Sequence, residues 1–226
     1  MIRGISSMAT RQLLEQLARD YQSRSGIETT FESVGGVEAA KRVRAGETFD
    51  LAVLASDVID GLIAEGHLLA GSRTDLVRSG IAIAVRAGMP HPAIGSEEAL
   101  RASVLAADSI GYSTGPSGTA LMQLFERWGI AGDLQSRLVQ ARPGFPVGQL
   151  VAQGQAQLGF QQLSELINLP GIEIIGPMPE AIQIITTFSA GICAASTQAD
   201  ALHGLLAFLA GPDSTRAKQR QGMEPA

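Results

Sequence analysis

Serine, threonine and glycine residues gather where predicted strands pass into predicted helices. The clearest case is the stretch 111–129, GYSTGPSGTALMQLFERWG, where a helix opens with no charged residue near its start. The first turn of a helix presents unpaired backbone N–H groups and the positive end of the helix dipole, and hydroxyls add neutral donors. At any one junction a turn with a simple helix cap would use the same residues. Because junctions in both halves of the chain share the pattern, we predict an anion-binding site. Its candidate residues are Ser6, Ser7, Ser33, Gly35, Gly36, Ser113, Thr114, Ser117 and Gly118.

Other kinds of site are not supported by the spacing of residues. The loop GPSGTAL lacks the lysine and the glycine spacing of a nucleotide P-loop, and neither GYSTG nor GPSG matches the GxSxG of serine hydrolases. His67, His91 and His203 are scattered, without the spacing of a metal site. The only cysteine, Cys193, lies in the apolar run AGICAAS, which is typical of a buried structural thiol. We therefore expect no metal and no cofactor.

Composition limits the partners. The chain has 226 residues, of which 45% are hydrophobic and 17% charged, as in a globular protein of one large domain or two lobes. A net charge of −5 and the absence of a basic run argue against nucleic acid and anionic membranes. No segment is apolar and long enough for membrane insertion. Residues 1–8 lack the apolar part of a signal peptide, so the sequence as written predicts a cytoplasmic protein, or a periplasmic one if a leader had been removed.

Strand-like and helix-like patterns alternate along the chain, which predicts an α/β fold with parallel sheets. Ligands of such sheets bind beyond the carboxyl ends of the strands, where the candidate residues lie. Ser56 or Asp57 is expected to cap the helix that follows the third strand. Strands are expected at 2–6, 26–33, 49–56, 76–88, 108–113, 136–141, 157–161, 172–179 and 181–196. Helices are expected at 8–24, 35–46, 97–107, 146–156, 162–169, 199–211 and 213–221. One further helix is expected to carry Ile59, Leu62 and Ile63, and another is expected to open within the stretch 111–129.

Two long extended runs indicate two lobes. One lies near 79–87 and the other near 182–195, and each could carry the chain from one lobe to the other. The first lobe would then comprise residues 1–80 plus 187–226, and the second residues 81–186.

Four segments resemble a known family. They are FDLAVLASDVIDGLIAEGHLL, LVRSGIAIAVRAGMPHP, GYSTGPSGTAL and AQLGFQQLSEL, and their order covers nearly the whole chain. The chain resembles the molybdate-binding group of solute-binding proteins, which have the type II periplasmic-binding-protein fold. The resemblance implies two Rossmann-like lobes joined by two crossover strands and closing over a ligand in the cleft between them. It also implies a small anionic ligand, no cofactor, and a transporter permease as a partner only if the protein is exported.

The resemblance implies which positions contact the ligand. A serine follows the first strand in that family, which corresponds to Ser6 or Ser7. Another follows the second strand and corresponds to Ser33, although glycine N–H groups at 35–36 are an alternative. Backbone N–H groups in the loop 115–119 and near Val147 complete the second lobe.

The last family ligand is a tyrosine, and here the chain departs from the family. Gln162 occupies that position and is preceded by Gln161. Two arginines are also of interest: Arg142, which precedes the helix at 146, and Arg78, which lies in the long strand. Each is either a solvated surface charge or a guanidinium that binds a carboxylate through two parallel hydrogen bonds. The amide and the arginines favour an organic carboxylate or a phosphorylated acid over molybdate.

The same scaffold also occurs in proteins that resemble this one and act as aconitate isomerases. Such an enzyme must remove a proton from one carbon and return it to another. Candidate groups near predicted strand ends are Glu32, Asp57, Tyr112 and Glu165, of which we favour Tyr112 and Glu165. We expect a binding protein for a small oxyanion, carboxylate or phosphorylated acid, with a cofactor-independent isomerase of an unsaturated polycarboxylate as the alternative.

Overall fold

The computed structural model describes residues 1–226, which fold as two units. The chain passes from the first unit to the second within strand β4 (Thr74–Arg86) and returns at the start of strand β9 (Ile185–Ile192). Unit 1 comprises Met1–Ser79 and Thr186–Ala226, and unit 2 comprises Gly80–Ile185.

Unit 1 is built on a mixed sheet with the strand order β2-β1-β3-β9-β4. Strand β1 pairs in parallel with β2 and with β3, whereas β9 is antiparallel to β3. A short strand, β10, pairs with β4 through Arg78 and Val77. The strands other than β4 and β9 are β1 (Ile2–Ser7), β2 (Thr29–Val34), β3 (Leu51–Ala55) and β10 (Glu224–Pro225).

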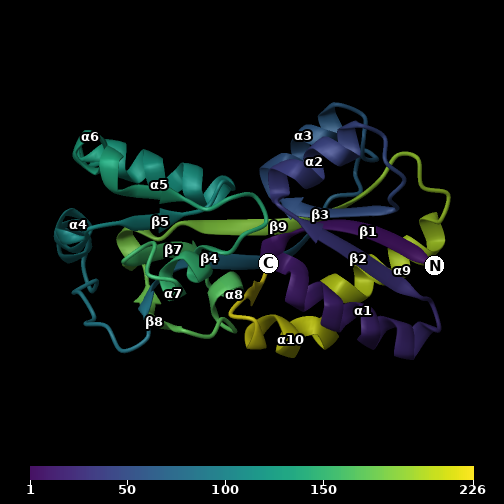
Figure 1. Cartoon of the computed structure of the whole chain (residues 1–226). Helices are drawn as coiled ribbons and strands as arrows, with labels where there is room; N and C mark the ends of the chain where they lie inside the picture. Colours follow the sequence, from purple (N-terminus) through teal and green to yellow (C-terminus); the bar gives the residue numbers. More distant parts are fainter. The chain divides into compact units, whose positions relative to one another are not determined.

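Helices cover both faces of this sheet because its strands are apolar on both faces. In β3, Leu51 and Val53 join the core beneath α1 and α9, while Ala52 and Leu54 join the core beneath α2 and α3. Side chains of a strand alternate between its two faces, so one buried strand supplies both cores. Figure 1 shows α2 and α3 on one side of the unit 1 sheet and α1 and α10 on the other. The helices are η1 (Met8–Thr10), α1 (Arg11–Ser25), α2 (Gly36–Arg44), α3 (Ser56–Ala64), α9 (Ala199–Ala210), η4 (Pro212–Ser214) and α10 (Thr215–Arg220).

Unit 2 repeats this plan around the sheet order β4-β7-β5-β6, with β8 also paired to β4. Strand β5 is parallel to β6 and β7, and β4 is antiparallel to β7 and β8. In β4, Ile81, Ile83 and Val85 face α4 and α5, whereas Ala82 and Ala84 face α8. The further strands are β5 (Ile110–Tyr112), β6 (Leu138–Gln140), β7 (Leu158–Gln162) and β8 (Ile172–Pro177). The helices are α4 (Glu97–Ala106), α5 (Pro116–Arg127), α6 (Ala131–Leu134), η2 (Gln135–Arg137), α7 (Val147–Ala152), α8 (Leu163–Leu166) and η3 (Glu180–Ile182).

Four features differ from the sequence-based expectations. The sheets are mixed rather than parallel, because β4 and β9 run against their neighbours. The helix expected at 162–169 is confined to Leu163–Leu166, and strand β10 was not expected. Neither Ser56 nor Asp57 caps α3, since the cap position is Ala55 and no side chain accepts a hydrogen bond there. None of the helices combines the length and apolar composition that crossing a membrane requires.

Candidate functional site

The first group of candidate donors lies at the carboxyl ends of β1 and β2. Because these strands are parallel and in register, Ser6 lies opposite Ser33, and their hydroxyl oxygens are 2.8 Å apart. The Ser6 hydroxyl, which is fully buried, also lies 3.3 Å from the carbonyl oxygen of Ser7. A hydroxyl carries one proton, so Ser6 can donate to only one of these oxygens at a time. The structure thus brings Ser6 and Ser33 together as a hydrogen-bonded pair.

Ser7 differs from Ser6 because its buried hydroxyl has no hydrogen-bond partner. A Cβ atom added at Gly36 would lie 3.8 Å from the Ser7 Cβ, so this hydroxyl-bearing residue is next to the first residue of α2. No side chain caps α2, whose cap position is Gly35. An unpaired buried hydroxyl costs about 1–3 kcal/mol. Its place beside an uncapped helix start is therefore typical of a site completed by a ligand.

The second group of donors surrounds the start of α5. The hydroxyls of Ser113 and Ser117 are 3.1 Å apart, and Ser117 is buried. A Cβ atom at Gly118 would lie 1.9 Å from the carbonyl oxygen of Ser113, so the loop is pressed onto the helix where only glycine fits. Pro116 takes the first helical position, as expected, and no side chain caps the helix. Thr114 lies in the same loop and is half-buried.

Two glycines let helix α7 approach the sheet of unit 2 closely. A Cβ atom at Gly111 would come within 2.9 Å of Val147, and one at Gly159 within 2.5 Å of Val151. The backbone N–H of Val147 donates to Oε1 of Gln161 at 2.7 Å. The family resemblance assigned this N–H to the ligand, but in the structure it is bonded to a side chain of the same unit.

Gln161 also connects α7 to a carboxylate. Its Nε2 donates to Oε2 of Glu165 at 2.7 Å. Burial raises the pKa of Glu165 to about 7, and the hydrogen bond from Gln161 partly opposes this shift. Gln162, the residue at the family's tyrosine position, is buried and lies opposite Ile81 of β4. The network from Val147 to Glu165 could not be recognised from sequence.

The two candidate arginines, Arg78 and Arg142, are exposed. Arg78 lies 3.4 Å from the carbonyl oxygen of Pro225, and Arg142 lies in the loop before α7. Neither makes a salt bridge. The structure therefore favours the reading of both as surface charges.

The four candidate acid–base residues differ in their surroundings. Glu32 forms a salt bridge with Arg42, which lowers the pKa of the Glu32 carboxyl and makes it a poor base. Asp57 is exposed in the first turn of α3, and Tyr112 packs against the core of unit 2. Burial raises the pKa of Glu165 towards neutrality.

Several buried polar groups were missed by the sequence analysis. Lys218 is 1% exposed, its ammonium has no hydrogen-bond partner, and burial lowers its pKa. The hydroxyls of Ser79 and Ser164 are also buried without a partner. The segment TRAKQRQ looks like a surface helix, so nothing in it marks Lys218. Cys193 is buried as expected, and burial raises the pKa of its thiol to about 12.

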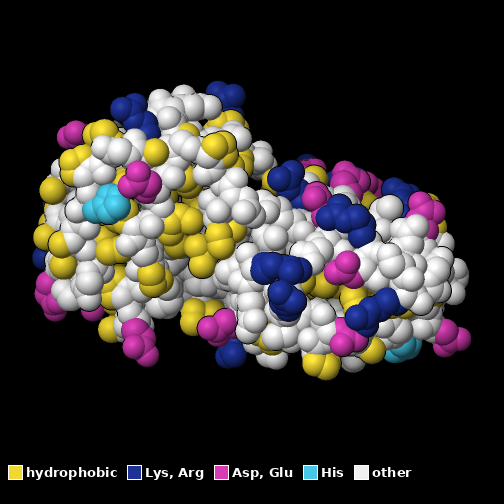
Figure 2. All heavy atoms as spheres, turned by 90° about the horizontal axis from the view of Figure 1, so that it is seen from below, with side chains coloured by type: hydrophobic (Ala, Val, Ile, Leu, Met, Phe, Trp, Pro, Cys, Tyr) yellow, Lys and Arg dark blue, Asp and Glu magenta, His cyan; other side chains and the backbone are white.

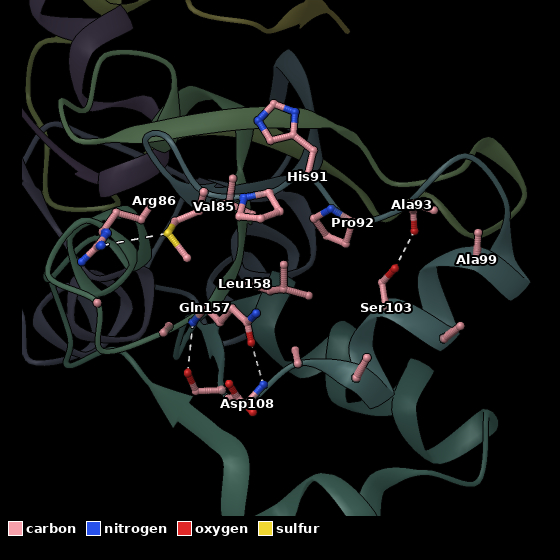
Figure 3. A pocket seen from close by; sticks show the side chains of 18 residues that line it. Val85, Arg86, His91, Pro92, Ala93, Ala99, Ser103, Asp108, Gln157 and Leu158 are labelled. Carbon is pink, nitrogen blue, oxygen red and sulfur yellow. Dashed lines mark hydrogen bonds between the residues drawn. The ribbon is translucent and has the colours of Figure 1, made fainter.

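A separate pocket of about 800 Å³ lies in unit 2 (Figure 3). Ser109 and Leu158 in its wall stand at the amino ends of β5 and β7, opposite to the strand ends that carry the hydroxyl groups. Its polar groups are engaged internally, since Gln157 accepts the N–H of Asp108 at 2.7 Å. This position is not the one at which α/β sheets bind their ligands.

Charge does not single out another site. Figure 2 shows Lys and Arg side chains interspersed with Asp and Glu on the face that it presents. No three His, Cys, Asp or Glu side chains lie close enough together to hold a metal ion.

Comparisons with known proteins identify the family. Residues 2–224 match the sequence profile of the bacterial extracellular solute-binding proteins. An aconitate isomerase from a Pseudomonas species is 35% identical over an alignment of 229 residues, gaps included. The alignment covers 98% of this chain and 86% of that protein.

Two solved structures share the fold. The periplasmic molybdate-binding protein of Azotobacter vinelandii superposes with a TM-score of 0.82 at 19% identity, covering 99% of this chain and 98% of that chain. The L-phospholactate-bound PEB3 has a TM-score of 0.77 at 11% identity, and both chains are covered completely. A PEB3 structure from Campylobacter jejuni is also similar. The predicted type II periplasmic-binding-protein fold is confirmed. The chain belongs to the family of bacterial extracellular solute-binding proteins.

Proposed function

We propose that this protein binds a small organic polycarboxylate through hydroxyl and backbone N–H donors at the carboxyl ends of its strands. The observation that carries the proposal is the buried hydroxyl of Ser7, which has no partner and lies beside the uncapped start of α2 at Gly36. An oxyanion accepts hydrogen bonds from hydroxyl and N–H groups, and the helix dipole favours its negative charge. The Ser113 and Ser117 hydroxyls at the start of α5 supply a second set of such donors.

Two observations favour an organic carboxylate over molybdate. The first is the Val147 N–H, which donates to Gln161 and is not free for a small tetrahedral oxyanion. The second is the relative at 35% identity, whose name states that it acts on aconitate, a tricarboxylate. The solved structures are too distant in sequence to decide the ligand, since they are only 11% and 19% identical.

A panel of anions tests this proposal by thermal shift: citrate, cis-aconitate, trans-aconitate, 3-phosphoglycerate, molybdate, tungstate, sulfate and phosphate. A ligand at 100 times its Kd stabilises a protein by about 2.7 kcal/mol. For a chain of this length that raises the Tm by about 5–11 °C. We expect the tricarboxylates to give this shift. A shift with molybdate and tungstate alone would contradict a carboxylate ligand, and no shift at all would contradict anion binding.

The Ser7→Ala variant locates the site. Losing one hydrogen bond to a charged ligand costs about 1.5–3 kcal/mol, so the Kd should rise by about 10- to 150-fold. Ser23→Ala is the matched control, because the Ser23 hydroxyl bonds to the carbonyl of Arg19 on the exposed face of α1. Equal affinities of the two variants in calorimetry would remove Ser7 from the site.

The second candidate function is isomerisation of an unsaturated polycarboxylate. It is favoured by the 35% identical relative and by the pKa of Glu165, which burial raises to about 7. For a pure binding protein, we propose a transporter permease as the partner, because the matched family consists of extracellular solute-binding proteins. Unchanged ligand after long incubation with the protein would support the transport role.

A further inference from the structure

Glu165 lies at the edge of the unit 2 sheet that carries the hydroxyl donors. Strands β5 and β7 are parallel, with Gly111 opposite Gly159. Continuing this register by two residues brings Ser113 level with Gln161, so both lie where their strands end. Glu165 follows on α8 and receives the Gln161 side chain at 2.7 Å.

The orientation of the Gln161 amide is determined by its two contacts. A backbone N–H can only donate, so the atom that meets Val147 must be the amide oxygen. The NH₂ group then faces Glu165 and donates to Oε2. Oε2 is thereby held as an acceptor, which leaves Oε1 as the oxygen that can take and release a proton.

The surroundings keep this carboxyl available in both protonation states. Burial raises its pKa to about 7, and no charged side chain contributes to the shift. A general acid–base group works best when its pKa lies near the working pH. Glu32 lacks this property because its salt bridge with Arg42 lowers the pKa of its carboxyl.

We propose that Glu165 is a catalytic residue that carries a proton between two carbons of a bound unsaturated tricarboxylate. This inference rests on the proposed function, because the ligand must first be bound at the donors described above. The ionised Oε1 removes a proton from the methylene carbon, forming its O–H bond as the C–H bond breaks. The electron pair becomes a new carbon–carbon double bond, and the original double bond opens. The former vinylic carbon then takes the proton back from Oε1.

This sequence moves the double bond by one position and needs no oxidant, reductant or added group. One C–H bond is lost and one is gained, and Glu165 ends as it began. For cis-aconitate and trans-aconitate the product is the other isomer or the same compound with its methylene and vinylic positions exchanged. Gln161 is a positioning residue, since it holds Oε2 and acts on the ligand only through Glu165.

Proton NMR in D₂O tests the proposal with cis-aconitate and trans-aconitate as the probes. We expect the wild-type protein to exchange the methylene protons for deuterium and to interconvert the isomers. Glu165→Gln should lower both rates by about 10²- to 10⁴-fold. Its affinity for propane-1,2,3-tricarboxylate, a saturated analogue that cannot react, should change by less than about 5-fold. Glu126→Gln, at an exposed position of α5, is the control and should keep the wild-type rates.

The pH profile of kcat/KM distinguishes a positioning role of Gln161 from a purely structural one. The pKa of Glu165 is lowered by the hydrogen bond from Gln161, so removing it in Gln161→Leu should raise that pKa. The rising limb of kcat/KM should then move to higher pH, whereas a purely structural defect would lower the plateau without moving the limb.

The results of these experiments distinguish the proposed binding function from the proposed catalytic role of Glu165. If the saturated tricarboxylate binds but wild-type protein exchanges no deuterium, the catalytic inference is wrong and the binding function stands. If Glu165→Gln is folded and still exchanges deuterium at the wild-type rate, Glu165 is not the proton carrier. If no tricarboxylate binds, both proposals fail.

Discussion

The side-chain oxygen of Gln161 accepts the backbone N–H of Val147 at 2.7 Å, and this bond ties the start of α7 to the end of β7. It occupies a helix N–H group that would otherwise be available to an anion. It also directs the Gln161 NH₂ group towards Glu165. One amide thus connects the start of α7 to a carboxyl whose pKa burial raises to about 7.

Replacing this amide should destabilise unit 2. In Gln161→Leu the Val147 N–H loses its acceptor and Glu165 loses its donor. Leaving a buried polar group unpaired costs about 1–3 kcal/mol, which corresponds to about 2–12 °C in Tm. Gln123→Leu, at an exposed position of α5, should change stability by less than about 0.5 kcal/mol. Calorimetric melting of both variants measures the difference, and equal Tm values would show that the bond does not anchor α7.

The loop at the start of α5 depends on Gly118 in a way that alanine scanning can expose. A Cβ atom there would lie 1.9 Å from the carbonyl oxygen of Ser113, so Gly118→Ala must displace the loop. We expect a loss of about 1–3 kcal/mol and a weaker affinity for tricarboxylates. Gly61→Ala in α3 is the control, because nothing lies within 4 Å of the added methyl group and alanine favours a helix. A stable Gly118→Ala variant with wild-type affinity would contradict both the packing and the role of this loop.

Much of the fold follows from local patterns in the sequence. The strand LAVLA at 51–55 is apolar on both faces and is found buried on both faces. The leucine spacing of α1 predicts the buried residues Leu13, Leu14 and Leu17 correctly. Such patterns depend only on the period of a strand or helix, so they can be recognised without the tertiary structure. The antiparallel direction of β4 and β9 could not, because direction is set by how distant segments pair.

The candidate site was predictable only in part. The pairing of Ser6 with Ser33 follows from two parallel strands that end together. The bond from Val147 to Gln161 depends on how closely α7 approaches Gly111, which is a tertiary contact with no mark in the sequence. Lys218 is missed for the same reason, because a lysine in a polar segment is normally exposed. Whether these residues bind a ligand stays a prediction until the affinities are measured.

The buried ammonium of Lys218 should make the protein less stable than it could be. Burial lowers its pKa in the folded state, so the unfolded state binds the proton more tightly. Stability should therefore rise as the pH increases towards the unfolded pKa of about 10.4. Lys218→Met removes the unpaired polar group and should stabilise the protein by about 1–3 kcal/mol at neutral pH. Denaturant unfolding at pH 7 and pH 9 measures both effects. A lower stability of Lys218→Met at pH 7 would mean that the ammonium has a stabilising partner.

Glu165 should give stability the opposite dependence on pH in the acidic to neutral range. Burial raises its pKa from 4.5 to about 7, so the folded state holds the proton more tightly than the unfolded state. The stability that this provides is complete below the unfolded pKa and is lost as the pH rises through the folded value. Each unit of pKa difference corresponds to 1.36 kcal/mol, and screening by solvent at this half-buried side chain reduces the effect to about 1–2 kcal/mol.

The measurement is the Tm of wild type and Glu165→Gln between pH 5 and pH 8. A neutral amide cannot ionise. The Tm of the wild type should therefore fall by about 2–8 °C more than that of the variant as the pH rises. Glu126→Gln serves again as the control, because Glu126 is exposed on α5 and the substitution makes the same change of side chain. Parallel curves for wild type and Glu165→Gln would place the folded pKa near 4.5, and Glu165 would then be fully ionised at neutral pH. A carboxylate of that kind is too weak a base for the proton transfer proposed here, so the same curves would also argue against the isomerase.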